Sequence, residues 1–216
     1  MSVRYAGDIR TFLRHQPTIR RFLTARLAAC TRFFSMTPLC DTLRSLYISE
    51  LRNLFSAEVL LLRCLPTISK GATTPALRQA FSSQIGQTRI HVSRLERIFE
   101  ELSETVSDET CEAMNALVGE VQRYLEADGD NDVRDAGLIV AARKIHGYKA
   151  VTCESTRALA LCLSDAGAAD RLKATHDEER AADEEFARIA ESSVNVNAGN
   201  RSKAKAEVRR IDILGK

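Results

Sequence analysis

The chain has 216 residues, of which 44% are hydrophobic and 28% charged, with no tryptophan and only 4 prolines. Its formal net charge of +2 is unevenly spread, because residues 1–40 carry +6 and residues 196–216 carry +4, which leaves −8 for the residues between. An acidic body with two basic ends does not match a nucleic-acid-binding domain, which gathers its basic residues on one face of the fold. No apolar run reaches the roughly 18 residues that a membrane-spanning helix needs. The abundance of Ala, Leu, Arg and Glu favours an all-α protein.

Residues 1–36 are rich in arginine and aromatic residues, and Asp8 is their only acidic residue. Three interpretations stay open for this basic N-terminal extension: a segment outside the fold or left untranslated, with Met36 as the working start; an organellar transit peptide, which is typically Arg-rich and acid-poor; or an interaction arm. In each case we expect the folded domain to span residues 37–195.

The 6 cysteines form no Cys-x-x-Cys pair and lack the density of a secreted disulfide scaffold. Such usage is typical of reduced thiols in an intracellular protein. We therefore predict an intracellular protein, located in an organelle if the extension is a transit peptide; the resemblance described below implies the cytoplasm.

Proline and glycine turns divide the domain into helices. We predict a helix from Thr37-Pro38 to Leu65-Pro66, a second from Thr74-Pro75 to about Leu102, a shorter one from Asp108 to the break at residues 127–131, a long one from Asp132 to about Ser164, and a last one from Ala168 to Glu191. Four long helices with a shorter one between the second and third indicate an antiparallel four-helix bundle. The polar, basic tail over residues 196–216 shows no sustained period, and we predict it to be disordered.

Each long helix interrupts its apolar stripe with polar residues at mid-length. The candidate metal ligands are Glu58, His91, His146, His176, Glu179 and Asp183. In an antiparallel bundle such mid-length positions meet at one level, and carboxylates with imidazoles at that level are how bundles hold two iron or manganese ions.

Several segments resemble the YciE/YciF family of ferritin-like stress proteins. They are LRNLFSAEVLLLRCLPTISKGATTPALRQAF, QTRIHVSRLERIFEEL, CEAM, VRDAGLIVAARKI and RLKATHDEERAADEEF, in the family's order and spacing over about residues 42–192. The resemblance implies a ferritin-like bundle, usually a homodimer in the bacterial cytoplasm, that holds a di-metal centre and responds to stress.

The chain departs from the family pattern within the candidate site. Gln87 stands where the family has a glutamate, and His146-Gly147-Tyr148-Lys149 stands where the family has Glu-His-Tyr-Glu; no Glu-x-x-His is present at all. Two hypotheses follow. Either an altered centre binds one or two ions of iron, manganese or zinc and carries out iron(II) or peroxide oxidation, or the metal is gone, Lys149 supplies the positive charge instead, and the bundle acts by dimerisation or partner binding. A Lys149 side chain pointing into the cluster would favour the second hypothesis.

Overall fold

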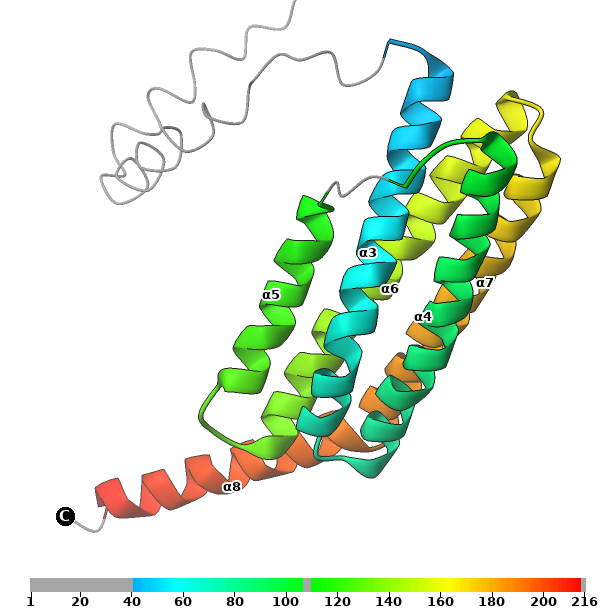
Figure 1. The fold of residues 1–216 in the computed structure, drawn as a ribbon. Coiled ribbons are helices and arrows are strands. Elements are labelled where there is room, and N and C mark those ends of the chain that lie inside the picture. Colours follow the sequence, from blue (N-terminus) through cyan, green and yellow to red (C-terminus); the bar gives the residue numbers. More distant parts are fainter. Residues whose placement is uncertain (1–40, 107–109, 215–216) are drawn as a thin grey trace, which may run out of the picture. The chain divides into compact units, whose positions relative to one another are not determined.

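The computed structural model describes residues 41–106 and 110–214, with side chains as far as Ala204 and for Glu207 (Figure 1). The elements are α3 (Leu43–Gly71), α4 (Pro75–Leu102), α5 (Glu112–Glu126), α6 (Asn131–Cys162), α7 (Ala166–Ile189), a π-helix (Ala190–Val194) and α8 (Asn195–Leu214). Over this part of the chain no strand is present. The predictions for residues 1–36 and for Asp108, and the predicted start at Thr37-Pro38, fall outside the described residues.

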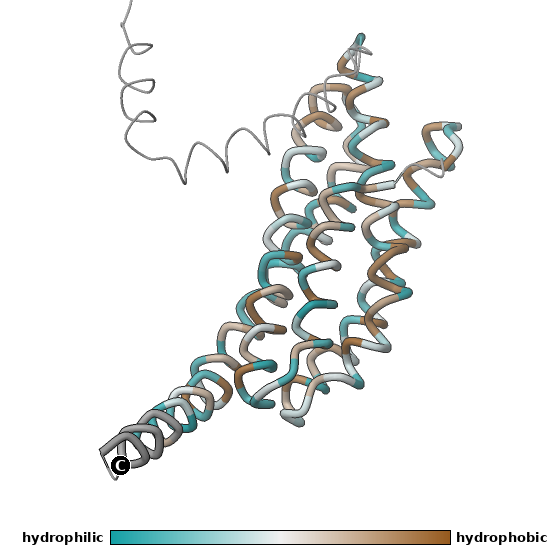
Figure 2. The backbone as a smooth tube through the Cα atoms, turned by 90° about the vertical axis from the view of Figure 1, so that its left-hand side faces the viewer, coloured by the Kyte–Doolittle hydropathy of each residue, from teal (hydrophilic) through white to brown (hydrophobic). Residues whose placement is uncertain are grey.

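The four long helices α3, α4, α6 and α7 form an antiparallel bundle (Figure 1). Helix α3 packs against α4 and α6, α7 packs against the same two helices, and the shorter α5 lies against α3 and α6. Along each helix hydrophobic and hydrophilic residues alternate (Figure 2), as expected when one face of each helix is buried. The predicted all-α four-helix bundle with an additional shorter helix is confirmed.

Helix α3 begins and ends differently from the sequence prediction. It begins with a capping box, in which Thr42 and Ser45 each accept a hydrogen bond from the other's backbone N–H. The predicted end at Leu65-Pro66 is wrong, because the helix continues through Pro66 to Gly71. A proline inside a helix costs roughly 3 kcal/mol. Burial of Ile68 in the last turn, to 3% exposed, offsets part of that cost.

Asp135 of α6 ties the start of α4 to the bundle. Its fully buried carboxylate accepts hydrogen bonds from Thr73 N (3.0 Å), Thr73 Oγ1 (2.7 Å) and Thr74 N (2.7 Å). Thr74 is the N-cap of α4 but makes no side-chain capping bond of its own. Asp135 therefore supplies from another helix the acceptor that a helix N-terminus needs.

The tail is helical rather than disordered over residues 195–214. The π-helix carries α7 into α8, and α8 packs beside α6. Arg201 Nε lies 2.6 Å from Asp132 Oδ2 at the first turn of α6. The sequence prediction missed this helix because its ion pair with α6 lies at Arg201 and the buried Val194 precedes it in the π-helix, so no apolar stripe marks it.

A buried polar layer divides the hydrophobic core into two clusters. One cluster includes Leu61, Phe81 and Phe186, and the other includes Leu51 and Phe99. The side chains between them are charged or polar and nearly inaccessible: Glu58, His91, His146, Lys149 and Glu179.

Candidate functional site

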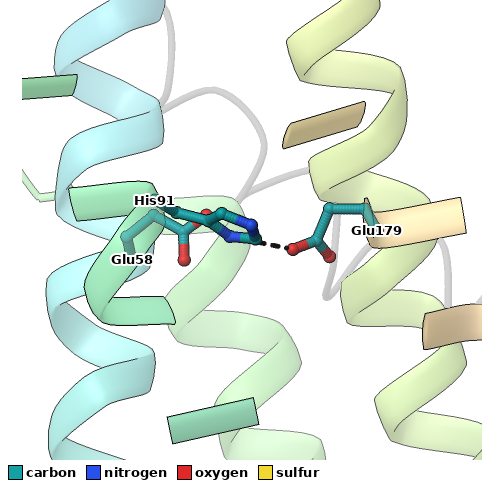
Figure 3. A group of neighbouring side chains, drawn as sticks. All are labelled: Glu58, His91 and Glu179. Carbon is teal, nitrogen blue, oxygen red and sulfur yellow. Dashed lines mark ion pairs between the residues drawn. The ribbon is translucent and has the colours of Figure 1, made fainter. Parts of the chain in front are cut away.

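The polar layer draws on all four long helices. Glu58 comes from α3, His91 from α4, His146 and Lys149 from α6, and Glu179 from α7. Figure 3 shows Glu58, His91 and Glu179 pointing toward one another from three separate helices. One ligand atom of each of these three lies within 4.8 Å of the others. Of the six predicted ligands, Glu58, His91, His146 and Glu179 lie together in this layer, and Lys149 joins them; we call these five side chains the buried cluster.

Lys149 lies at the centre of the buried cluster. Its Nζ is 2.9 Å from Glu58 Oε2 and 2.6 Å from Glu179 Oε1. His91 Nδ1 lies 3.3 Å from Glu58 Oε1 and 3.2 Å from Glu179 Oε1. On the other side of Glu179, His146 Nδ1 is 2.7 Å from Oε2. Each carboxylate thus faces a lysine ammonium and an imidazole.

Most of these short contacts lack the angles of a hydrogen bond. Both oxygens of Glu58, His91 Nδ1 and Glu179 Oε1 are buried without a hydrogen-bond partner of good geometry, although each is within ion-pair distance of a charged or titratable partner. The attraction within the cluster is therefore mainly Coulombic, and charge balance decides what the cluster can hold.

The second ring nitrogen of His91 reaches a carboxylate that the sequence prediction had not counted as a ligand. His91 Nε2 lies 2.9 Å from Glu178 Oε2 and 3.2 Å from the Gln87 amide nitrogen. Arg94 forms a two-pronged ion pair with the same Glu178, one third of whose side chain is exposed. The sequence does contain a signal for this contact, because Arg94 follows His91 by three residues and so lies on the same face of α4, where it can pair with the same carboxylate.

Burial and charge compete in setting the pKa values of the cluster. Burial lowers the pKa of His91, but Glu179 and Glu58 outweigh burial and raise it to about 9. Burial likewise lowers the pKa of Lys149, and the charges of Glu179 and Glu58 raise it above its ordinary value. Burial raises the pKa of Glu179, whereas Lys149 and the hydrogen bond with His146 hold it well below the usual range. At neutral pH, His91 and Lys149 therefore both carry a proton.

This protonation of His91 predicts a pH-dependent stability. Because the folded pKa of about 9 lies above the ordinary 6.5, the stabilisation is fully present below pH 6.5 and is lost as the pH rises through about 9. The shift corresponds to roughly 3 kcal/mol, since one pKa unit is about 1.4 kcal/mol. Urea unfolding between pH 6 and pH 10 should show this loss in the wild type and a flatter profile in His91→Gln. Identical profiles for the two proteins would contradict it.

The buried cluster does not fit the di-metal centre that the family resemblance implies. Glu58 and Glu179 supply two negative charges, which Lys149 and protonated His91 already neutralise. A divalent ion that displaced the His91 proton would still leave a net charge of about +1 in a site whose side chains are at most 7% exposed, and an uncompensated buried charge is strongly disfavoured. A protonated lysine also has no lone pair with which to bind a metal.

Two predicted ligands lie outside the buried cluster. His176 is partly exposed and pairs with Asp177 (3.1 Å), and Asp183 accepts from Arg143 (2.7 Å). Each follows a buried residue of α7 by one position, Thr175 and Ala182 respectively. Because one helical residue turns the side chain by about 100°, both point to the flank of α7 rather than to its buried face.

The fold and the buried polar layer define this molecule as a ferritin-like helical bundle. A family model described as a domain of unknown function, DUF892, matches residues 42–199. The chain therefore belongs to this family, which confirms the assignment to YciF-like proteins made from sequence.

Two relatives illustrate the likeness. Protein YciF of Escherichia coli strain K12 is 32% identical over 162 residues, which cover 74% of this chain and 98% of YciF. The crystal structure of this E. coli stress protein matches with a TM-score of 0.70 and 31% identity, covering 72% of this chain and 99% of that one. YcfI of Rhodopseudomonas palustris, described as a candidate structural protein, matches with a TM-score of 0.67 and 26% identity over 73% of this chain and 99% of that one.

None of the described helices is both long enough and apolar enough to cross a membrane.

Proposed function

We propose that this chain acts as a metal-free structural bundle of the YciF-like stress-protein family and works through its surface, as a homodimer, rather than by oxidising iron or peroxide. One observation carries the proposal: the Lys149 ammonium stands 2.9 Å from Glu58 and 2.6 Å from Glu179, among the atoms that a metal would require. An internal cation thereby supplies the charge that a metal would bring.

The space around the buried cluster supports the same proposal. A cavity of ≈ 20 Å³ lies beside Lys149 and His146 and is also lined by Gln84 and Thr88. Such a volume holds about one water molecule. An organic substrate would find no room beside the charged groups. The description of the R. palustris relative as a candidate structural protein agrees with this role.

A single-metal site is the second candidate function. It is favoured by the convergence of Glu58, His91 and Glu179 within 4.8 Å, a set of ligand types that zinc and iron accept. It requires Lys149 to leave the cluster or to lose its proton, and the raised pKa of Lys149 opposes that loss.

Metal content tests the proposal directly. The full chain, loaded with iron(II), manganese(II) or zinc(II) and then desalted, should retain no stoichiometric metal by mass spectrometry of the elements. Retention of one ion per wild-type chain, lost in Glu58→Ala, would overturn the proposal. Metal that persists in Glu58→Ala is bound elsewhere and leaves the proposal standing.

Lys149→Glu provides the matched gain-of-binding variant. It exchanges the internal cation for a third carboxylate, so that three carboxylates and a neutral His91 around a divalent ion would carry a net charge of only about −1. We expect this variant to take up close to one manganese or iron ion per chain. A folded Lys149→Glu protein that stays free of metal would show that Lys149 is not what excludes the ion.

A further inference from the structure

The later turns of α8 extend beyond the part of the chain that matches the family. The family model ends at residue 199, and the match to E. coli YciF covers 98% of that protein. Helix α8 continues to Leu214. We call residues 200–214 the α8 arm. Since the arm lies outside the matched domain, its role has to follow from its own chemistry.

The bundle holds the α8 arm by one end. Arg201 Nε lies 2.6 Å from Asp132 Oδ2, and Arg201 Nη1 lies 3.7 Å from Asp130 Oδ2. Beyond this anchor, Figure 1 and Figure 2 both show the helix running away from the four long helices. At a rise of 1.5 Å per residue, the turns from Arg201 to Leu214 span about 20 Å.

The charge of the α8 arm is opposite to that of the bundle. The arm carries five Lys or Arg residues against Glu207 and Asp212, a net charge of +3, whereas residues 41–195 carry −8. Exposed charges more than about 10 Å apart are largely screened at about 0.1 M salt. Because the arm extends about 20 Å from its anchor, its far end can attract an anionic surface without being cancelled by the acidic bundle.

Apolar positions on the α8 arm favour a lipid surface over a nucleic acid. Helical spacing puts four apolar positions on one side of the arm: Ala204, Val208, Ile211 and Leu214. Basic positions flank this apolar stripe, Lys203 and Arg210 on one side and Arg201 and Lys205 on the other. Glu207 interrupts the stripe, but Lys203 precedes it by four residues and can pair with it. An apolar stripe flanked by Lys and Arg is the pattern of a helix that lies in a membrane interface, whereas nucleic-acid phosphates need only the cations.

We infer that the α8 arm binds the surface of an anionic phospholipid membrane, with its apolar stripe toward the acyl chains and its Lys and Arg residues at the phosphate groups. The inference rests on the proposed function in that it names a surface through which the bundle works. Each Lys or Arg near an anionic membrane raises the affinity about fivefold. The net charge of +3 therefore predicts about a hundredfold preference of the arm for an anionic over a neutral membrane.

Vesicle sedimentation of the full chain tests the inference. Vesicles with about one-third phosphatidylglycerol should bind the wild type about a hundredfold more tightly than vesicles of phosphatidylcholine alone. Arg209→Glu combined with Arg210→Glu should weaken binding to the anionic vesicles about a hundredfold, because the charge of the arm falls from +3 to −1. The matched control is Arg89→Glu combined with Arg180→Glu, which makes the same charge change at exposed positions of α4 and α7. This control should change the affinity less than about threefold, since both positions lie on the bundle rather than on the arm.

An apolar exchange distinguishes a lipid surface from a nucleic acid. Val208→Gln combined with Ile211→Gln should weaken vesicle binding about tenfold and leave the binding of a duplex DNA of about 30 base pairs unchanged. Val196→Gln is the control, because Val196 is 52% exposed but precedes the anchor, and this variant should bind vesicles like the wild type.

Three results would each overturn the inference: a wild type that does not bind anionic vesicles, a folded Arg209→Glu, Arg210→Glu protein that keeps the wild-type affinity, or tighter binding to DNA than to vesicles at equal phosphate concentration. Circular-dichroism melts establish that each variant is folded. No metal takes part in these measurements, so their outcome is independent of the metal content that tests the proposed function.

Discussion

The Lys149→Met variant should lose about 4 to 5 kcal/mol of unfolding free energy, because breaking a buried ion pair from one side leaves an uncompensated charge. In this variant Glu58 and Glu179 lose the ammonium that lies within 2.9 Å of both carboxylates. The expected loss lies at the upper end of the range because Lys149 is 1% exposed and the cavity beside it has room for only about one water molecule. Urea unfolding at constant chain concentration measures it from the transition midpoint.

Two companion variants separate charge from packing. Glu58→Gln combined with Lys149→Met removes one charge of each sign and should recover most of the loss, to within about 2 kcal/mol of the wild type. Lys173→Met removes a lysine that pairs with Asp177 at the surface, where the side chain is 56% exposed, and should change stability by less than about 1 kcal/mol. A double variant no more stable than Lys149→Met would show that the lysine acts by filling space rather than by charge.

Asp135→Ala should cost about 4 kcal/mol, because it leaves the backbone N–H groups of Thr73 and Thr74 and the hydroxyl of Thr73 without their acceptor. Asp135→Asn keeps one carbonyl oxygen at the same place and should cost roughly half as much. Hydrogen exchange should locate the effect at the start of α4, since Asp135 caps that end of the helix.

Asp132→Ala is the control for Asp135→Ala. Asp132 is also on the first turn of α6, but its partner Arg201 is 61% exposed, so the expected loss is less than about 1 kcal/mol. Equal losses in Asp132→Ala and Asp135→Ala would indicate that the first turn of α6 matters, rather than the buried hydrogen bonds.

Much of the fold follows from local patterns. Pro75 at the start of α4 and the glycine and aspartate turns near residues 129 and 165 mark helix boundaries that agree with the structure to within a few residues. Pro66 misled the prediction, because a local breaker was outweighed by burial of Ile68 in the turn that follows it. The sequence prediction missed helix α8 because the contacts that support it come from distant parts of the chain, and no local pattern shows them.

A residue of the buried cluster could be predicted from sequence when it lay at the centre of the apolar stripe of its helix. Glu58 and His91 are both fully buried, as their spacing among apolar residues indicated. His176 and Asp183 lay near the edge of the α7 stripe, and periodicity does not resolve a rotation of one residue. Only packing against α6 decides which side of α7 is buried, and that side is centred on Glu179.

The sequence alone determined that a carboxylate at position 58 would be buried in a helical bundle and would need a partner, because the period of the surrounding leucines leaves no exposed side for it. Whether the partner is a metal or an ammonium depends on the three-dimensional positions of four helices, which no local pattern contains. The tertiary structure places Lys149 Nζ within 2.9 Å of Glu58 and within 2.6 Å of Glu179. Any neighbouring positive charge can compensate a buried carboxylate. The packing of α6 against α3 and α7 determines that in this protein the charge is the Lys149 ammonium.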